Sequence, residues 1–372
     1  MSRPAPRLFY EFFAGGGMAR LGLGEGWECA FANDFDPVKA RAYRANFGAG
    51  DLKEGDVWAL TAGDLPGRAD LAWASSPCQD FSLAGGRAGL KGGRSSAFFG
   101  FWRLIEALVA QDRAPRLVVI ENVVGLLTSH GGADFTALCQ AVSDQGYGFG
   151  AIEVDASRFL PQSRRRILVI ACREPPAHLT RGRESRPGLA KAFARLPAAL
   201  QARWIAWPEP QETRRNTDLA ALLEPDEDVR WHSAAATAHI LGLLDARNHA
   251  KVAAALADGA LRVGAVYRRT RAGRQQAEVR FDGLAGCLRT PRGGSSRQTL
   301  LVAEHGAVRT RLISPRESAR LMGLPDTYAL PAKTTAALMV TGDGVAVPVV
   351  RWLAQAVLEP LLSPGPSVLA AE

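Results

Sequence analysis

Cysteine is scarce in this sequence of 372 residues: there are five, and they form neither a Cys-x-x-Cys pair nor a tight cluster with histidine. This scarcity excludes a disulfide scaffold and argues against a structural zinc site, so we expect no bound metal. The sequence also lacks any uncharged apolar run of about 18 residues, and Met1–Tyr10 contains no apolar signal core. We therefore expect a protein of the reducing cytoplasm that is neither secreted nor membrane-spanning.

No residue class is in large excess, because 47% of the residues are hydrophobic and 22% are charged. This average composition excludes disordered and collagen-like chains, and the length predicts two domains or one large domain with an insertion. The formal net charge of +8 is unevenly distributed, since nine arginines and only two acids lie between Arg262 and Arg297. Such a segment is typical either of a solvated surface or of a surface that contacts phosphates.

Short apolar runs alternate with amphipathic stretches in the first 175 residues, a pattern that favours βαβ units around a parallel sheet. The expected strands are Leu8–Phe13, Glu28–Asn33, Leu71–Ser75, Leu117–Ile120, Phe149–Val154 and Ile167–Ala171. The expected helices are Pro37–Asn46, Ala97–Ala110 and Asp134–Asp144. The glycine-rich stretch Gly85–Gly93 predicts a mobile loop between two of these elements.

The alternation stops near residue 175, and the following segment is richer in proline, arginine and tryptophan, which marks a second domain. Ser314, followed by Pro315 and by Glu317 at the capping-box spacing, predicts the start of a helix over 315–324. A final amphipathic stretch, Pro348–Leu362, is expected to pack back on the first domain. The predicted domains are 1–175, 176–325 and 326–372.

A glycine-rich turn, Phe13-Ala14-Gly15-Gly16-Gly17, follows the first expected strand and would let a nucleotide-like cofactor approach backbone N–H groups. Arg20 stands where a dinucleotide fingerprint needs glycine, which disfavours a nicotinamide enzyme. Asp34 and Asp36 follow the second strand where an acid typically binds ribose hydroxyls, although both are also suited to capping the next helix. Asp56 lies at a third strand end, where taken alone it is a turn residue.

Three strand ends carry residues suited to covalent catalysis. Cys78, in Ser75-Ser76-Pro77-Cys78-Gln79, follows an apolar strand and is placed for nucleophilic attack, although most single cysteines are small buried hydrophobes. Glu121 ends another apolar strand, where a carboxylate is costly unless it is partnered or functional. Arg164 and Arg166 precede the last strand at alternate positions and indicate either an anion clamp or a structural ion pair with a glutamate.

In order and spacing these motifs resemble those of the cytosine carbon-5 DNA methyltransferases, nearly from end to end. Pro77-Cys78-Gln79 is similar to the nucleophile motif, Glu121-Asn122-Val123 to the acid motif, and Gln162 with Arg164 and Arg166 to the Gln-x-Arg-x-Arg motif. Arg311 through Gly323 resembles the ninth motif. The resemblance implies an α/β fold with the Rossmann-like doubly wound sheet of S-adenosylmethionine-dependent methyltransferases. It also implies a smaller target recognition domain inserted before the C-terminal return.

The resemblance also implies which residues form each site. Catalytic roles fall to Cys78, Glu121, Arg164 and Arg166. Contacts with the cofactor, S-adenosyl-L-methionine, fall to Phe13, Ala14, Gly15, Gly17, Asp34, Phe35, Asp56, Val57, Pro77, Asp343 and Val345. Contacts with double-stranded DNA are expected for Gln79, Ser82, Arg268, Arg269, Arg271, Arg289, Arg292, Gly293 and Gly294. A monomer is expected, and a restriction-modification system is the context that the family suggests.

Three positions depart from the family pattern. Met18 stands where glycine is more usual, and Cys287 replaces the threonine of the Thr-Leu…Gly-Gly ending of the recognition domain. The last motif reads Gly342-Asp343-Gly344-Val345 in place of Gly-Asn-Ser-Val. Asp343 would alter the charge around the methionine end of the cofactor.

The implied mechanism begins with addition of the Cys78 thiolate to cytosine carbon-6 while Glu121 protonates ring nitrogen-3. Arg164 is expected to steady Glu121 or the cytosine carbonyl, and Arg166 the loop that carries Cys78 or a DNA phosphate. The base must be flipped out of the duplex, and the Gly85–Gly93 loop is expected to close over it.

Three alternatives are weighed against this interpretation. An amino-group methyltransferase is disfavoured, because Pro77 is followed by Cys78-Gln79 and not by Pro-Tyr. A transfer-RNA cytosine carbon-5 methyltransferase stays open, since a basic segment does not separate DNA from RNA. A catalytically silent DNA-binding relative is disfavoured by the intact catalytic motifs.

Overall fold

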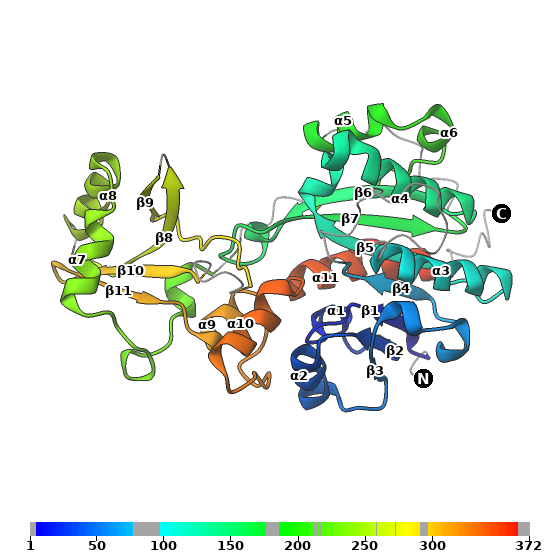
Figure 1. The fold of residues 1–372 in the computed structure, drawn as a ribbon, viewed down its shortest axis with the longest axis horizontal. Helices are drawn as coiled ribbons and strands as arrows, with labels where there is room; N and C mark the ends of the chain where they lie inside the picture. Colours follow the sequence, from blue (N-terminus) through cyan, green and yellow to red (C-terminus); the bar gives the residue numbers. More distant parts are fainter. Residues whose placement is uncertain are drawn as a thin grey trace, which may run out of the picture. The chain divides into compact units, whose positions relative to one another are not determined.

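The computed structural model describes residues 5–76, 97–175, 186–210, 215, 217–257, 259–271, 273–290 and 297–363. The chain forms two compact units (Figure 1). The first unit comprises Met1–Val154, Arg165–Gln211 and Val349–Glu372. The second unit comprises Asp155–Arg164 and Glu212–Pro348.

A seven-stranded sheet with the order β3-β2-β1-β4-β5-β7-β6 lies at the centre of the first unit. Its strands are β1 (Arg7–Phe12), β2 (Trp27–Asp34), β3 (Leu52–Glu54), β4 (Leu71–Ala74), β5 (Leu117–Val123), β6 (Gly148–Asp155) and β7 (Arg165–Cys172). All six predicted strands are confirmed within a few residues, whereas β3 was too short to produce a recognisable pattern. Strands β3, β2, β1, β4 and β5 pair in parallel, so their carboxyl ends meet at one edge.

Strand β7 runs antiparallel to β5, so the expectation of a parallel sheet is wrong at this strand. Residues 156–164, which connect β6 to β7, are too few for the helical crossover that a parallel neighbour needs. The reversal brings the beginning of β7 beside the carboxyl end of β5, with Arg166 opposite Val123. A basic residue at the start of β7 therefore lies at the same edge as the acid motif.

Helices cover the two faces of this sheet (Figure 1). They are α1 (Met18–Leu23), α2 (Pro37–Phe47), α3 (Ala97–Ala110), α4 (Ala133–Asp144), α5 (Pro187–Arg195) and α6 (Ala198–Gln201). The three predicted helices correspond to α2, α3 and α4 and are confirmed. Asp36 caps α2 by accepting hydrogen bonds from the N–H groups of Val38 and Lys39, so the capping interpretation of Asp36 is confirmed.

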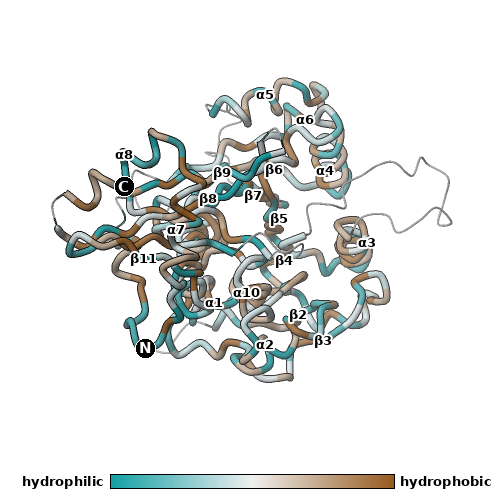
Figure 2. The backbone as a smooth tube through the Cα atoms, turned by 60° about the vertical axis from the view of Figure 1, so that its left-hand side comes forward, coloured by the Kyte–Doolittle hydropathy of each residue, from teal (hydrophilic) through white to brown (hydrophobic). Residues whose placement is uncertain are grey.

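The core of the first unit is rich in aromatic side chains. Phe101 of α3, a largely hydrophobic helix (Figure 2), packs on Phe12 of β1 with ring centroids 4.8 Å apart. Trp204 is fully buried against Phe149 and Phe193. Because Trp204 packs in this core, the predicted boundary at 175/176 is wrong: the first unit continues to Gln211.

The C-terminal stretch also belongs to the first unit, as expected. It consists of α11 (Val347–Leu353), a π-helical turn (Ala354–Leu358) and α12 (Glu359–Leu362). Arg351 donates to the carbonyl of Leu23 over 2.6 Å, and Glu359 accepts from Trp27 Nε1 over 3.1 Å. The return begins at Val349, and not at residue 326 as the predicted boundary had it.

One stretch, Thr334–Leu362, is long and apolar enough to cross a membrane by length and composition alone. It contains α10 (Thr334–Asp343) and is interrupted after Gly344. Val350, Leu353 and Leu358 are fully buried within the protein. We therefore interpret its apolar character as that of a core segment.

The second unit is built on an antiparallel four-stranded sheet with the order β11-β10-β8-β9. Its strands are β8 (Arg262–Arg271), β9 (Arg274–Arg280), β10 (Thr299–Glu304) and β11 (Ala307–Leu312). Helices α7 (Ala234–Gly242) and α8 (Ala246–Ala257) pack on one face, and Ile240, Val252, Val266 and Leu301 form the core between them. The arginine-rich segment thus supplies the β8–β9 hairpin, for which the sequence analysis made no structural prediction.

A buried ion pair organises the start of α9 (Pro315–Arg320) in the second unit. Arg311 donates to both carboxylate oxygens of Glu317, over 2.7 and 2.5 Å, and neither side chain is more than 2% exposed. Ser314 and Glu317 form the predicted capping box, which is confirmed. Burial opposes the charged form, but hydrogen bonds from Arg311 and from the N–H groups of Ser314 and Glu224 hold the pKa of Glu317 below its ordinary value.

Replacing this carboxylate, Glu317→Gln, is expected to reduce the free energy of unfolding by about 3–5 kcal/mol at pH 7, because it leaves Arg311 buried without its counter-charge. A carboxyl whose pKa is lowered by folding stabilises the protein above its unfolded pKa and loses this contribution as the pH falls through the folded pKa. The deficit should therefore shrink below about pH 4.5. Urea unfolding at pH 7 and pH 4 measures it. Glu227→Gln, an exposed change in the same unit, serves as the control, and equal stability of the two variants at pH 7 would contradict the prediction.

Candidate active site

The glycine-rich turn after β1 has the backbone of a ligand-binding loop. Phe13, Gly15 and Gly17 have positive φ angles of 55°, 58° and 77°. A Cβ on Gly17 would lie 2.3 Å from the ring of Phe47, so this position requires glycine. A Cβ on Gly15 would have no described atom within 4 Å, which leaves room for a ligand to approach the loop.

Asp34 fixes this turn to the end of β2. One carboxylate oxygen accepts from Gly15 N and the other from Asp36 N, each over 2.8 Å. Asp34 is buried, and burial raises the pKa of its carboxyl. The expected ribose acid is therefore at the loop, and its oxygens also position the loop backbone.

The residues expected to hold an adenosine gather at the ends of β2 and β3. Phe35 is 63% exposed, which is unusual for a phenylalanine and leaves its ring free to stack. Asp56 is exposed and caps a short 3-10 turn by accepting from Trp58 N over 3.0 Å, while Val57 is buried. The amide of Asn33 holds this segment by donating to the carbonyls of Lys53 and Gly55.

Glu11 is a buried acid two residues before the glycine-rich turn that the sequence analysis did not single out. It is 1% exposed on β1, and Oε1 accepts from Arg20 N of α1 over 3.3 Å. Among the described residues, Oε2 has no hydrogen-bond partner. Burial raises the pKa of Glu11 to about 8. The sequence does contain a signal for Glu11, because it is the only acid within the apolar run Leu8–Phe13. A buried acid is costly without a partner, and a cationic ligand group would supply one.

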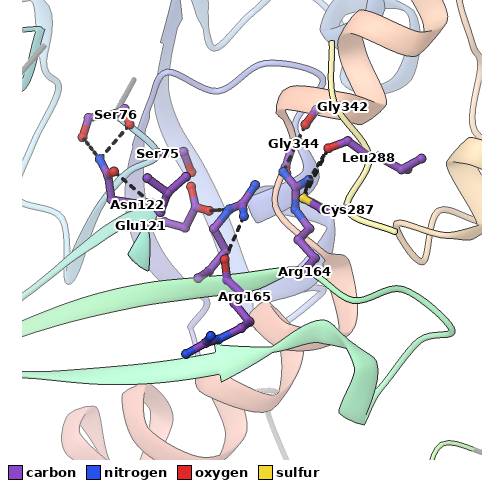
Figure 3. A network of polar contacts seen from close by, with 12 residues as sticks. Ser75, Ser76, Glu121, Asn122, Arg164, Arg165, Cys287, Leu288, Gly342 and Gly344 are labelled. Carbon is purple, nitrogen blue, oxygen red and sulfur yellow. Dashed lines mark hydrogen bonds and ion pairs between the residues drawn. The ribbon is translucent and has the colours of Figure 1, made fainter. Parts of the chain in front are cut away.

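The acid motif is positioned by its neighbours on β5 and β7 (Figure 3). Glu121 is 6% exposed and forms an ion pair with Arg166 Nε over 2.9 Å. Asn122 donates to the carbonyl of Ser76 over 3.0 Å, and its own oxygen accepts from Val123 N. Asn122 thus ties the acid motif to Ser76, two residues before Cys78.

Arg166, and not Arg164, is the partner of Glu121. The hypothesis that Arg164 steadies Glu121 is therefore corrected, and the structural ion pair that the sequence left open is formed by Arg166. The cause is the reversed strand β7, whose register sets Arg166 opposite Val123 and Leu168 opposite Glu121.

Arg164 belongs to the second unit, where it holds three backbone carbonyls (Figure 3). Its guanidinium is 2% exposed and donates to the carbonyls of Leu288 over 3.1 Å, Gly342 over 3.1 Å and Gly344 over 2.6 Å. It also contacts the Cys287 sulfur at 3.5 Å. Arg164 is thus a positioning residue that fixes the backbone on both sides of Asp343.

Gly342 of the last motif lies close to the backbone of Arg289. A Cβ on Gly342 would lie 2.7 Å from the backbone of Arg289, which explains the glycine. Asp343 is exposed at the end of α10, and Val345 is buried. Their predicted contact with the cofactor stays a prediction.

Arg268 and Arg269 are exposed on β8, and Arg289 is also exposed. Arg269 lines a polar groove of about 640 Å³ in the second unit, together with Asn248, Lys251 and Glu278. Several expected site residues lie outside the described residues: Pro77, Cys78, Gln79, Ser82, the Gly85–Gly93 loop, Arg292, Gly293 and Gly294. The side chain of Arg271 is likewise not described.

The arrangement in the first unit fits a ligand that combines an adenosine with a cationic group. The open loop at Gly15, the exposed ring of Phe35 and the Glu11 oxygen that no described residue hydrogen-bonds meet those chemical needs. A comparison with protein-family models matches residues 8–359 to the C-5 cytosine-specific DNA methylases. The chain belongs to the C-5 cytosine-specific DNA methylase family.

Known proteins align with almost the whole length of this C-5 methylase. Type II methyltransferase M.HhaI of Haemophilus parahaemolyticus is 26% identical over 351 residues, covering 93% of this chain and 92% of that protein. Type II methyltransferase M.HpaII of Haemophilus parainfluenzae is 27% identical, with coverages of 95% and 89%. The crystal structure of S. pombe Dnmt2 methyltransferase shares the fold, with a TM-score of 0.62 at 18% identity and coverages of 96% and 100%.

Two arginine substitutions should separate the roles of the Gln-x-Arg-x-Arg segment in this C-5 methylase. Arg166→Lys keeps a charge near Glu121 but loses the planar guanidinium, so methyl transfer should fall about 10- to 100-fold with little change in unfolding. Arg164→Lys should instead lower the free energy of unfolding by about 2 kcal/mol or more, because an ammonium cannot satisfy all the carbonyls. Rates and urea unfolding of both variants test this, and a reversed pattern would contradict the assignment.

Asp34→Asn leaves a single acceptor oxygen, so the side chain can no longer accept from both Gly15 N of the loop and Asp36 N. Losing one hydrogen bond to a charged group costs about 1.5–3 kcal/mol, so the Kd for S-adenosylmethionine should rise about 10- to 100-fold. Calorimetric titration measures this Kd. Asp51→Asn, which loses only a partly exposed ion pair with Arg20, is the matched control, and equal affinities for the two variants would refute the role.

Proposed function

We propose that this protein transfers a methyl group to carbon-5 of a cytosine in a specific sequence of duplex DNA, through a transient cysteine adduct. The observation that carries the proposal is the buried pair of Glu121 and Arg166 at the sheet edge where β4 also ends. The family match over residues 8–359 supports the same reaction. The Type II names of the relatives further support a role in a restriction-modification system of the cytoplasm.

The Cys78 thiolate is proposed to add to carbon-6 of the ring, because carbon-5 alone is a poor nucleophile and addition raises its electron density. Asn122 would hold Ser76, and with it the start of the segment that carries Cys78. After methylation a base removes the carbon-5 proton, the carbon–sulfur bond breaks and Cys78 leaves as a thiolate.

Glu121 is proposed to give a proton to ring nitrogen-3 as the thiolate adds, and to take it back when the cysteine leaves. Its burial, together with the single ion pair to Arg166, orients the carboxyl group. Arg166 would keep the position of Glu121 constant while the charge on the ring changes, which is a form of electrostatic preorganisation.

S-adenosylmethionine, the implied cofactor, supplies an electrophilic methyl group when it is bound. The residues that would hold it are the backbone of Phe13–Gly17, the ring of Phe35 and the carboxyl groups of Asp34 and Asp56. Glu11 would face a cationic part of the ligand, because its Oε2 accepts no described hydrogen bond. The role of the exposed Asp343, from the second unit, belongs to the same proposal.

The target cytosine must leave the base stack, because neither Cys78 nor Glu121 can reach ring atoms inside a duplex. The second unit is proposed to be the target recognition domain. Its exposed Arg269 lines a polar groove of that unit and can donate hydrogen bonds to acceptors on base edges.

Cys78→Ala and Glu121→Gln should each reduce methyl transfer to duplex DNA at least about 100-fold, because one removes the nucleophile and the other the proton donor. Transfer of labelled methyl from S-adenosylmethionine, followed by bisulfite sequencing, measures the rate and locates the product. Cys172→Ala, a cysteine of β7 with no proposed role, is the control. A comparable rate for Cys78→Ala would refute the scheme, and faster transfer to transfer RNA than to duplex DNA would reassign the substrate.

A covalent trap tests the adduct directly. DNA with 5-fluorocytosine at the target cannot lose a carbon-5 proton, so the wild-type protein should stay bound through denaturing electrophoresis when donor is present. Cys78→Ala should not be trapped. Absence of a trapped wild-type complex on DNA that it binds would indicate a silent DNA-binding relative.

A further inference from the structure

The arginines of the second unit fall into two groups according to their partners. One group forms ion pairs with carboxylates: Arg215–Asp218, Arg280–Asp282, Arg309–Asp226, Arg311–Glu317 and Arg320–Asp326. The other group forms no ion pair with any described carboxylate and includes Arg247, Arg269 and the two arginines considered further, Arg268 and Arg297. Arg297 donates to the carbonyl of Ile313, and its Nε is buried without a described hydrogen-bond partner. These two guanidinium groups therefore retain charge that the protein does not neutralise.

These two arginines lie at the same end of the sheet. Val266 of β8 pairs with Thr299 of β10, the last pair in that direction, and Arg268 and Arg297 each lie two residues beyond it. Val266 belongs to the core under α7 and α8, so the same alternation directs Arg268 toward the helix-bearing face. Like charges close together on a sheet destabilise it unless an anion lies between them.

A third basic group, His232, adjoins the same end of the sheet. It lies just before the Ser233 cap of α7, and its Nδ1 is 3.0 Å from the hydroxyl of Thr310 on β11. Burial lowers the pKa of His232, and the charges of Arg268 and Arg297 lower it further. Arg309 and Arg311, on either side of Thr310, are neutralised by Asp226 and Glu317.

We propose that His232, Arg268 and Arg297 form a binding site for one backbone phosphate of duplex DNA. We call these three residues the cationic cluster. The inference rests on the proposed function, which makes duplex DNA the partner. It adds an anchor beyond the base-reading groove, because a phosphate contact fixes position and register without reading sequence. A phosphodiester would neutralise the two guanidinium groups and offer acceptors to Arg268 and the imidazole.

The cluster gives DNA binding a defined pH dependence. A bound phosphate favours the protonated imidazole, whereas the free cluster disfavours it, so complex formation takes up a proton. Affinity for DNA should therefore increase as the pH falls from 8 to 6 in the wild-type protein. Replacing His232 should remove part of this increase.

The experiment measures the affinity of the full-length protein for a labelled DNA duplex by fluorescence anisotropy, over a range of salt concentrations and at pH values from 6 to 8. Arg268→Gln and Arg297→Gln should each reduce the slope of log K against log salt by about 0.9, the value of one released counterion. Arg268→Lys and Arg297→Lys should restore most of it. Arg309→Gln, a paired arginine on the same sheet, should leave the slope nearly unchanged.

The pH arm compares His232→Gln with His239→Gln, which changes an exposed histidine of α7. Only His232→Gln should flatten the dependence of affinity on pH. Circular dichroism melting of each variant distinguishes lost binding from lost folding, and the lysine variants supply a second test where a glutamine variant unfolds.

The possible outcomes separate this proposal from the proposed function. Unchanged salt slopes in folded Arg268→Gln and Arg297→Gln, with methyl transfer to DNA intact, would overturn the cluster alone. Reduced slopes in a protein that methylates no cytosine would support the cluster and overturn the reaction. Cluster-dependent binding that is tighter to transfer RNA than to duplex DNA would overturn the assignment to DNA.

Discussion

The ion pair between Glu121 and Arg166 is the contact on which the organisation of the catalytic edge depends. An acidic side chain at the end of the apolar strand β5 is costly to bury without a partner, and the guanidinium of Arg166 supplies that partner from β7. Arg166 can approach Glu121 because β7 runs antiparallel to β5. In this direction the first residues of β7 lie beside the last residues of β5. The reversal of one strand in a mainly parallel sheet is thus a requirement of the chemistry as well as of the short connection from β6.

A second constraint is that the ligand loops are held by backbone hydrogen bonds to a few buried polar side chains. Asp34 fixes the glycine turn, Asn33 fixes the segment before Asp56, and Asn122 fixes Ser76. Each of these side chains ends a strand of the same sheet, so the rigidity of the sheet passes directly to the loops. The loops can then present exposed groups such as Phe35 to a ligand without a core of their own.

Much of the first unit could be predicted from its sequence, because strands buried on both faces appear as short apolar runs and Asp36-Pro37 marks a helix start. The motif residues were also found, since residue type and order are properties of the sequence. The partners of Arg164 and Arg166 could not be predicted. Arg164 binds backbone carbonyls of the second unit, whereas Arg166, two positions later, binds the carboxylate of Glu121. Those partners depend on β7 being antiparallel, which residue type does not reveal. A second domain was expected, but its strands were not predicted, because they mix arginine with apolar residues.

The charge of the second unit shows why composition alone is a poor guide to a binding surface. Its arginines are numerous, but several are fully engaged in structure: Arg311 neutralises a buried glutamate, and Arg280 pairs with Asp282 at the end of β9. Arg268 and Arg297 differ in that each lies two residues beyond the pair of Val266 and Thr299, at one end of the sheet, and neither forms an ion pair with a described carboxylate. The charge of an arginine in a salt bridge is largely neutralised, so it attracts a polyanion only weakly. Two neighbouring guanidinium groups without carboxylate partners repel each other, and a bound anion would stabilise them. The partners of each arginine, and not their number, therefore determine where this unit can bind phosphate.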